Sequence, residues 1–593
     1  MTGYMSARRS ALPLLLIGVA AVLSVSLLQF ASIADAQPAP ANAVPLAAND
    51  PALTLWTEDA LAGLPPLAVP DYTFGLAQYT ITAVRCNHVY HANLGGTPSY
   101  GYANGTYADT PGPTLITQRN RPIGVRWVND LPSGPDMNIF SIDPTVMGAP
   151  QDNSNRMVTH VHGLHVLPSS DGLPTQWFGP GKFRLDKYPN IQAASELWYH
   201  DHALGITRTN VYAGLAGLYF NRDSYENKLN TYAKLPMIGG INGAYEIPLV
   251  FQDKDFLVTR DAKQNITGSY LYYPSTWQPE FFASISVVNF KVWPHLDLQP
   301  RMYRFRILNA TNSRFINMIL PSNLLWIQIG AEGGFMPAPA YMGNTLLIAP
   351  AERADVLVDF SSMAGQSFIL GNNAPAPYGA APEEFPDPTV AHTMGQLMQI
   401  NVGTGRAGGV PINMSKLRAG LPPVKNLGPS VPLYHYTKRK LLEEIFLADG
   451  VTVIPTLDGK RFADPVSRNE IEHLGSTAVW EIVNTTPDTH PMHIHLETFQ
   501  VLGRQTFDTT TFEPYVTWPN PLNNTATGPL ILTGAFQGPR PNETGLKDTV
   551  QCPEGMVTWI KIKWEDFIGT WVWHCHILEH EENDMMRPLE VGL

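Results

Sequence analysis

The sequence predicts an all-β fold built from three related β-sandwich domains, and three observations support this. The 593 residues include 48 glycines and 52 prolines, which separate many short runs rich in Val, Ile, Leu, Tyr and Trp, such as PIGVRWVNDLP, SFILGNNAP and MVTWIKIKWED. Helical periodicity is rare, and its best example is KRKLLEEIFLAD, around Leu441 to Leu447, where we expect a helix. The third observation is an internal repeat, which sets the number of domains.

The repeat is a strand pattern of one charged residue, two apolar residues and an asparagine. It occurs at Arg126–Asn129, Arg306–Asn309 and Glu481–Asn484, at nearly equal spacing along the chain. This spacing suits the size of a β-sandwich and predicts three domains. We place them at residues 50–230, 231–405 and 431–593, with the Gly-, Pro- and Lys-rich stretch 406–430 as a linker.

The N-terminal segment predicts export. Two arginines precede the apolar run LPLLLIGVAAVLSVSLL, which is followed by a small-residue site ending at Ala36, so we expect residues 1–36 to be a secretory signal peptide. The arginine pair weakly indicates the twin-arginine route, and an uncleaved membrane anchor is the alternative. We therefore expect a secreted or periplasmic protein, monomeric and not attached to the membrane after cleavage.

The charge limits the possible partners. The formal net charge is -12 and the chain has no long run of Lys or Arg. Nucleic acid and anionic membrane surfaces are therefore not expected partners, whereas small neutral or cationic substrates remain possible.

Ten of the 17 histidines lie in four short clusters, each of which contains the pattern H-x-H. Residues two apart on a strand face the same side, so each pair can present two imidazoles to one site. A single pair is commonly a surface feature, but four pairs in one exported β protein predict a metal centre. The clusters are HVHG (His160, His162), YHDH (His200, His202), HPMHIH (His490, His493, His495) and HCHILEH (His574, His576, His580).

Cys575 indicates which metal is bound. On an extended segment its thiol faces away from His574 and His576, so the two histidines and the cysteine serve different sites. A cysteine, two histidines (His490, His580) and a methionine (Met585) are the ligand set of a blue-copper electron-transfer centre. Zinc more often recruits several cysteines at each site. The alternative is that Cys575 is only a small buried apolar residue.

The middle domain lacks the corresponding histidines. In the third domain, His490, His493 and His495 follow the repeat asparagine Asn484. The residues at the same distances after Asn309 in the middle domain are Phe315, Met318 and Leu320. We therefore expect the middle domain to act as a spacer and wall, and the first and third domains to carry the chemistry.

The four clusters match, in order and spacing, the copper-binding signatures of the multicopper oxidase family. The segments YHDHALGITRTNVYAGLAGLY and VVNFKVWPHLDLQPRMYRFRILNATNSRF resemble the branch that contains the spore-coat laccase, bilirubin oxidases and phenoxazinone synthase. The resemblance covers nearly all of the chain after the signal. It implies three cupredoxin-like domains, four copper ions, and reduction of O2 to water with electrons from a separate reducing substrate.

The resemblance also implies a role for each ligand position. It gives the type 1 copper to His490, Cys575, His580 and Met585, and the type 2 copper to His160 and His493. It gives the type 3 pair to His162, His200, His202, His495, His574 and His576. The complete set argues against the copper-free relatives of the family. An axial Met585, with Met586 as packing, favours a modest reduction potential and thus easily oxidised phenols and aromatic amines.

Two carboxylates match the same branch. Asp171 and Glu581 resemble acids that serve the three-copper site and its proton supply, which four-electron reduction of O2 requires. The alternatives are a turn residue before glycine for Asp171 and a solvated acidic turn for Glu581.

The other two cysteines, Cys86 and Cys552, predict a disulfide between the first and third domains, the alternative being two unpaired thiols. His165, His295 and His473 fit no ligand pattern, so we expect structural roles for them.

The functional hypothesis is a laccase-like oxidase of phenols, aromatic amines or tetrapyrroles. A metallo-oxidase of Mn(II) or Cu(I) is a second hypothesis, although the 18 methionines are dispersed and form no Met-rich insert. Copper storage or resistance without turnover is a third, against which the complete O2 site argues.

Overall fold

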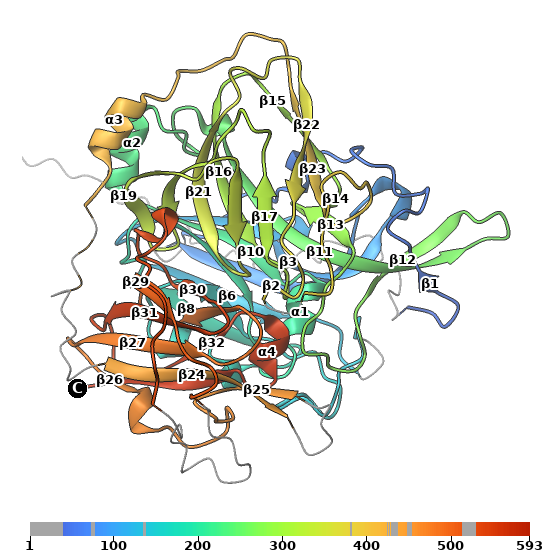
Figure 1. Cartoon of the computed structure of the whole chain (residues 1–593). Coiled ribbons are helices and arrows are strands. Elements are labelled where there is room, and N and C mark those ends of the chain that lie inside the picture. The colour runs from blue at the N-terminus through green and yellow to red at the C-terminus, as the bar shows by residue number, and fades with distance from the viewer. Residues whose placement is uncertain are drawn as a thin grey trace, which may run out of the picture. The chain divides into compact units, whose positions relative to one another are not determined.

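The computed structural model describes residues 39–72, 77–134, 138–379, 382–423, 425, 427, 437–446, 453–512 and 529–593. The predicted signal peptide lies outside these residues. Gln37–Leu593 form one compact unit, and the described part consists mostly of strands, which confirms the all-β prediction (Figure 1). Among the described residues, none of the helices is long and apolar enough to cross a membrane.

The strands form three successive pairs of sheets along the chain. The first pair contains one sheet of β4 (Tyr107–Asp109), β3 (Thr97–Asn104), β2 (Gln78–His88), β6 (Ile123–Asn129) and β8 (Phe183–Tyr188), in that order. Its second sheet contains β5 (Gly112–Gln118), β10 (Ala216–Arg222), β9 (Ser195–Asp201) and β7 (Thr159–His162).

The second pair contains the largest sheet. Its order is β14 (Lys291–Val292), β13 (Ile285–Val288), β11 (Glu246–Arg260), β16 (Met302–Asn309), β21 (Arg353–Asp359), β18 (Ile327–Ala331) and β19 (Gly334–Tyr341), with β1 (Val44–Pro45) and β12 (Ile266–Tyr272) also paired to β11. The facing sheet is β15 (His295–Leu298), β23 (Gln396–Val402), β22 (Ser367–Asn372), β17 (Ile316–Ile319) and β20 (Thr345–Ile348).

The third pair consists of two five-stranded sheets. One is β25 (Val453–Leu457), β24 (Thr437–Phe446), β27 (Thr477–Asn484), β31 (Met556–Lys563) and β29 (Phe499–Thr506). The other is β26 (Ile471–His473), β33 (Met586–Gly592), β32 (Gly569–Cys575), β28 (His490–Ile494) and β30 (Thr549–Cys552).

The described α-helices are short and connect strands: α1 (Thr207–Ala213), α2 (Ser224–Ala233), α3 (Met414–Gly420) and α4 (Leu578–Glu582). Helices α1 and α4 lie side by side (Figure 1). Helix α3 falls within the predicted linker 406–430, where its Leu417 packs with Leu229 of α2. Single 3-10 turns lie at Ala60–Gly63, Ala92–Leu94, Pro168–Ser170, Pro174–Gln176, Gly243–Tyr245, Arg468–Glu470 and Pro541–Glu543.

The sequence repeat occupies the same position in each pair of sheets. Strands β6, β16 and β27 each end at the repeat asparagine, and each pairs in parallel with the preceding long strand, β2, β11 or β24. The side chain of each asparagine (Asn129, Asn309, Asn484) donates to two backbone carbonyls and accepts from the N–H two residues further on. Asparagine recurs because its amide completes both the turn and the backbone hydrogen bonding at the strand end.

The prediction of a helix around Leu441 to Leu447 is wrong. Residues 437–446 form strand β24, which pairs with β27 on one side and β25 on the other. This pairing buries Lys440, Leu442 and Ile445. Tertiary pairing thus overrides a local pattern that favours a helix.

The predicted disulfide is also wrong. Cys86 lies on β2 opposite Ser99, whereas Cys552 lies on β30 opposite His490, and both thiols are buried and free. The Cys86 Sγ contacts the Ser99 carbonyl oxygen at 3.6 Å, and the Cys552 Sγ contacts the Val550 carbonyl oxygen at 3.8 Å. Burial raises the pKa of Cys552 to about 12, so this thiol stays protonated and unreactive at neutral pH.

Candidate metal centre

All twelve side chains singled out as ligands are at most 1% exposed, and the structure places them in two groups. One group contains Cys575, His490 and His580, with Met585 buried in the same core. The other group contains the remaining eight histidines. These are His160, His162, His200, His202, His493, His495, His574 and His576.

The cysteine group has the shape of a three-coordinate metal site. The Cys575 Sγ lies 3.6 Å from the His490 Nδ1 and 3.8 Å from the His580 Nδ1, and these two nitrogens are 3.3 Å apart. Three ligands about 2.1 Å from one ion in a trigonal plane lie about 3.6 Å from one another, so the spacing fits a single ion.

Secondary structure fixes this group. Cys575 ends β32, His490 begins the neighbouring β28, and His580 lies on α4. The backbone N–H of Met585 donates to the His580 carbonyl at 2.9 Å, and the Met585 carbonyl accepts from the Cys575 N–H at 3.0 Å. Met585 is thereby held beside the cysteine and the histidine of the group.

The eight-histidine group is formed jointly by the first and third pairs of sheets. His160 lies directly opposite His200 on the neighbouring strand, and His493 lies opposite His574. Imidazole rings stack between the two pairs of sheets, His160 on His495 and His162 on His493, with centroids 3.9 and 3.7 Å apart.

Within this group, ligand atoms gather in threes. Each triad has its possible ligand atoms within 4.8 Å of one another. In one of them the His574 Nε2 lies 3.2 Å from the His495 Nε2 and 3.4 Å from the His202 Nε2. The triads are His160, His162 and His493; His162, His200 and His576; and His202, His495 and His574.

Backbone carbonyls orient half of these eight rings. The Nδ1 atoms of His160, His200, His493 and His574 lie 2.6–2.9 Å from backbone carbonyl oxygens, to which each Nδ1–H donates. The Nε2 atoms of the first three have no hydrogen-bond partner although they are fully buried. An unpaired buried nitrogen is costly unless it binds something, and an imidazole held in this way is a typical metal ligand.

Burial also keeps nine of the ten imidazoles neutral. It lowers the pKa of His200 and His580 to about 3. The same cause, with neighbouring imidazoles adding to it, places the pKa well below the usual 6.5 for His160, His162, His202, His490, His493, His495 and His576. Neutral imidazoles are the form that binds metal.

Both predicted carboxylates contact these rings. The Asp171 Oδ2 accepts from the His495 Nδ1 at 2.7 Å, and burial raises the pKa of Asp171 to about 6. The Glu581 oxygens lie 3.3 Å from the His202 Nδ1 and 3.1 Å from the His574 Nδ1. Both side chains are buried, so the solvated acidic turn considered for Glu581 is excluded.

Sequence reasoning missed Asp548. Its Oδ1 lies 3.2 Å from the His162 Nε2, and its backbone carbonyl accepts from the His493 Nδ1 at 2.8 Å. Asp548 immediately precedes β30, whose pairing with β28 brings it to the histidines. It is far from every histidine cluster in sequence, so no local signal marks it.

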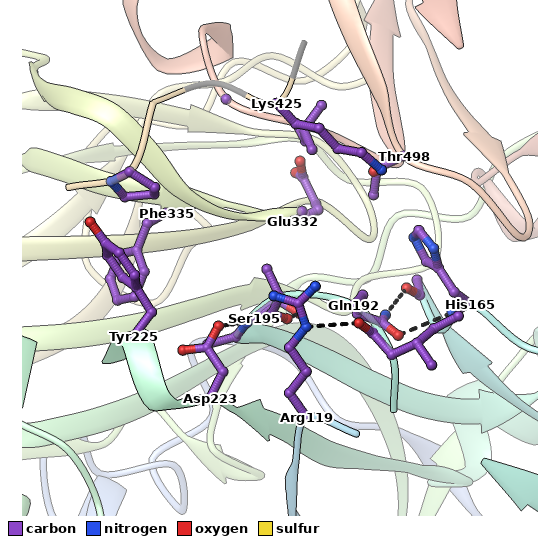
Figure 2. A pocket seen from close by; sticks show the side chains of 18 of the residues that line it. Arg119, His165, Gln192, Ser195, Asp223, Tyr225, Glu332, Phe335, Lys425 and Thr498 are labelled. Atoms are coloured by element: carbon purple, nitrogen blue, oxygen red, sulfur yellow. Dashed lines mark hydrogen bonds between the residues drawn. The ribbon is translucent and has the colours of Figure 1, made fainter. Parts of the chain in front are cut away.

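A cavity of about 480 Å³ lies next to this group. It is lined by residues from all three predicted domains, among them Ser195, Phe335 and Thr498 (Figure 2). Gly163, which follows the candidate ligand His162, also lines it. His165 lines it as well and forms an ion pair through its Nδ1 with the Asp566 carboxylate. His165 therefore links the first pair of sheets to the third.

This ion pair predicts a pH-dependent contribution to stability. Burial alone would lower the pKa of His165, but the Asp566 hydrogen bond and the nearby Glu497 carboxylate outweigh it and raise the pKa above 6.5. The stabilisation is therefore complete below about pH 6.5 and is lost as the pH rises through the raised value. His165→Gln should cost about 1.5–3 kcal/mol near pH 6, because the bond joins charged groups, and clearly less at pH 9.

Thermal unfolding of the wild type and His165→Gln at these two pH values checks this. An equal loss of Tm at both values would show that the histidine contributes through packing alone. Asp566→Asn, which removes the other charge of the ion pair, should likewise lower Tm more near pH 6 than at pH 9.

Three pairs of β-sheets with one thiol–imidazole site and one eight-imidazole site define a copper-dependent oxidase of cupredoxin architecture. A family model described as multicopper oxidase matches residues 431–592. The chain is 35% identical to a laccase of Bacillus subtilis over 536 residues, 86% of this chain and 94% of that protein. It is 36% identical to a laccase of Bacillus stratosphericus over 515 residues, covering 84% and 92% of the two chains. The chain belongs to the multicopper oxidase family.

The fold agrees with this membership. The crystal structure of a laccase from Pediococcus acidilactici superposes with a TM-score of 0.63 at 24% identity, covering 89% of this chain and 92% of that one. The protein is thus a laccase-like multicopper oxidase with three cupredoxin-like domains, an oxidoreductase that uses O2. Its cofactors are the four copper ions of the family, one type 1, one type 2 and two type 3.

Proposed function

We propose that the chain oxidises phenols and aromatic amines one electron at a time at the cysteine group and delivers the electrons to O2 at the eight-histidine group. His490, Cys575, His580 and Met585 would hold the type 1 copper. His160 and His493 would hold the type 2 copper. The six remaining imidazoles would hold the type 3 pair, with His202, His495 and His574 on one ion and His162, His200 and His576 on the other.

One observation carries this proposal: Cys575 belongs to one group while its peptide neighbours belong to the other. The Cys575 Sγ faces His490 and His580, whereas His574 and His576 point into the eight-histidine group. Two peptide units thus join the groups covalently. When bound, copper supplies one-electron transfer from the reducing substrate and four-electron reduction of O2 to water.

The chain's own groups would position the ligands and move protons. Asp171 and Glu581 contact the Nδ1 atoms of four ligand imidazoles, Asp171 those of His160 and His495 and Glu581 those of His202 and His574. We infer that these buried carboxylates hold the rings in place and pass protons inward, since O2 reduction consumes four protons. Burial favours the protonated acid at Asp171, and copper nearby would oppose this.

The thioether of Met585 favours one class of reducing substrate. A weak thioether ligand such as Met585 favours a modest reduction potential, which suits easily oxidised phenols, aromatic amines and tetrapyrroles. Oxygen uptake by the copper-loaded protein with a phenol, an aromatic amine, bilirubin, Mn(II) and Cu(I), side by side, tests this. Uptake should be fastest with an organic donor. Uptake with only Mn(II) or Cu(I) would establish a metallo-oxidase, and no uptake with any donor would point to copper storage.

We also propose that residues 1–36 direct export and are removed, that the domains span 50–230, 231–405 and 431–593, and that the mature protein is a monomer outside the cytoplasm. The sequence before Gln37 supports the first point. N-terminal sequencing of the protein isolated from the cell envelope or medium should begin at Gln37. A chain that still begins at Met1 and stays with the membrane would indicate the anchor instead.

A further inference from the structure

Arg353 of the middle domain contacts both of the other domains beside the eight-histidine group. It begins β21 and is 2% exposed. Its guanidinium makes a two-pronged contact with Asp548, Nη1 to Oδ1 at 2.8 Å and Nη2 to Oδ2 at 2.6 Å. Its Nε donates to the Glu196 carbonyl on β9, and Nη1 also donates to the Ala351 carbonyl, both at 3.1 Å. Residues of all three pairs of sheets thus meet at one side chain.

Asp548 connects Arg353 to His162. The Asp548 Oδ1 lies 3.2 Å from the His162 Nε2, and the Thr549 hydroxyl lies 3.3 Å from the same nitrogen. A carboxylate held by arginine is a strong acceptor, so the proton of a neutral His162 belongs on Nε2.

His162 is therefore turned the opposite way from its neighbours. His160, His200 and His493 donate through Nδ1 and leave Nε2 unpaired, whereas the buried Nδ1 of His162 is the atom without a partner. It is the Nδ1 lone pair that this arrangement presents to a metal. Without an acceptor at Nε2, the two tautomers would compete and the ring could rotate.

The backbone leaves room for this contact. Gly163 has φ +84°, and a Cβ there would lie 2.4 Å from the Asp548 Oδ2 and 2.8 Å from the Arg353 Nη2. Only glycine lets the ion pair approach the chain so closely directly after His162.

We propose that Arg353 is a positioning residue for the trinuclear copper site: it fixes Asp548, and Asp548 holds His162 in the tautomer that binds copper through Nδ1. The middle domain, expected from the sequence to be a spacer and wall, would then be a required part of the metal centre. This proposal rests on the proposed assignment of His162 as a copper ligand.

Arg353→Lys tests the proposal, because lysine keeps the charge but cannot form the two-pronged contact. Arg304→Lys is the matched control, since Arg304 on β16 is also buried and makes a two-pronged contact with a carboxylate outside the histidine group, through its Nε and Nη2 to Asp355. The readouts are copper bound per chain, copper affinity in competition with a chelator, blue absorbance and Tm. Loss of an outer partner of a ligand typically weakens metal binding about 10–100-fold.

We expect Arg353→Lys to bind copper at the eight-histidine group with an affinity lower by this factor and to keep its blue absorbance. Arg304→Lys should have a lower Tm but normal copper affinity. Asp548→Asn, which keeps the side-chain shape, should lose copper in the same way and serves if Arg353→Lys does not fold. Normal copper affinity in either Arg353→Lys or Asp548→Asn would overturn the proposal. His162→Ala tests the assignment of His162 as a copper ligand separately from the role of Arg353. If this variant retained all its copper, the ligand assignment itself would be wrong.

Discussion

Replacement of Cys575 by serine should remove the blue colour and reduce the oxidation of a phenol to background, while copper in the eight-histidine group stays bound. Serine cannot supply the thiolate on which the blue absorption of a copper–cysteine site depends. The electron path through the two peptide units next to Cys575 is lost with it, whereas His574 and His576 keep their positions. Visible absorption, copper per chain and oxygen uptake measure the three effects on one sample.

Cys552→Ser is the matched control for this change. Cys552 is as fully buried as Cys575 and lies opposite His490 on the neighbouring strand, but it is outside the thiol–imidazole group. This variant should lose some stability and keep both its colour and its activity. A Cys575→Ser protein that turned over like the wild type would show that electrons follow another path.

The second large effect is expected at Glu581. Glu581→Gln keeps the size of the side chain between His202 and His574 but cannot carry a proton inward. Loss of a positioned acid typically slows a reaction about 10²–10⁴-fold, so kcat should fall by this factor with all copper retained. Because electrons would enter faster than O2 could remove them, the blue band should bleach during turnover in air. Stopped-flow absorption measures this, and Asp171→Asn should behave similarly.

Glu582→Gln provides the comparison for Glu581→Gln. Glu582 is the next residue on α4 and equally buried, but it accepts from the backbone N–H and guanidinium of Arg208 on α1. Its loss should weaken the contact between α1 and α4 and lower Tm, with the blue band unbleached in air. If both variants slowed O2 reduction equally, the effect would come from α4 as a whole and not from the acid at Glu581.

Much of this arrangement could be predicted from the sequence because it rests on local geometry. The alternation of a strand places His574 and His576 on one side of β32 and Cys575 on the other, and the structure shows this separation. The repeat asparagines end equivalent strands, which is why counting them predicts three pairs of sheets.

The remaining features depend on which strands become neighbours. β24 is a strand because β25 and β27 flank it, although its own residues favour a helix. Cys86 and Cys552 stay unpaired because each thiol is buried within its own pair of sheets, which their number alone could not indicate. Asp548 contacts His162, and Arg353 contacts Asp548, only because the sheets assemble. No spacing in the sequence therefore indicates either residue.

The copper content of the purified protein after loading, measured by elemental analysis alongside its visible spectrum, tests the central claim most directly. We predict about four copper ions per chain and a blue absorption band, with the band lost in Cys575→Ser and about three coppers remaining there. A protein that binds zinc in place of copper, or a single copper per chain, would contradict the two-site account.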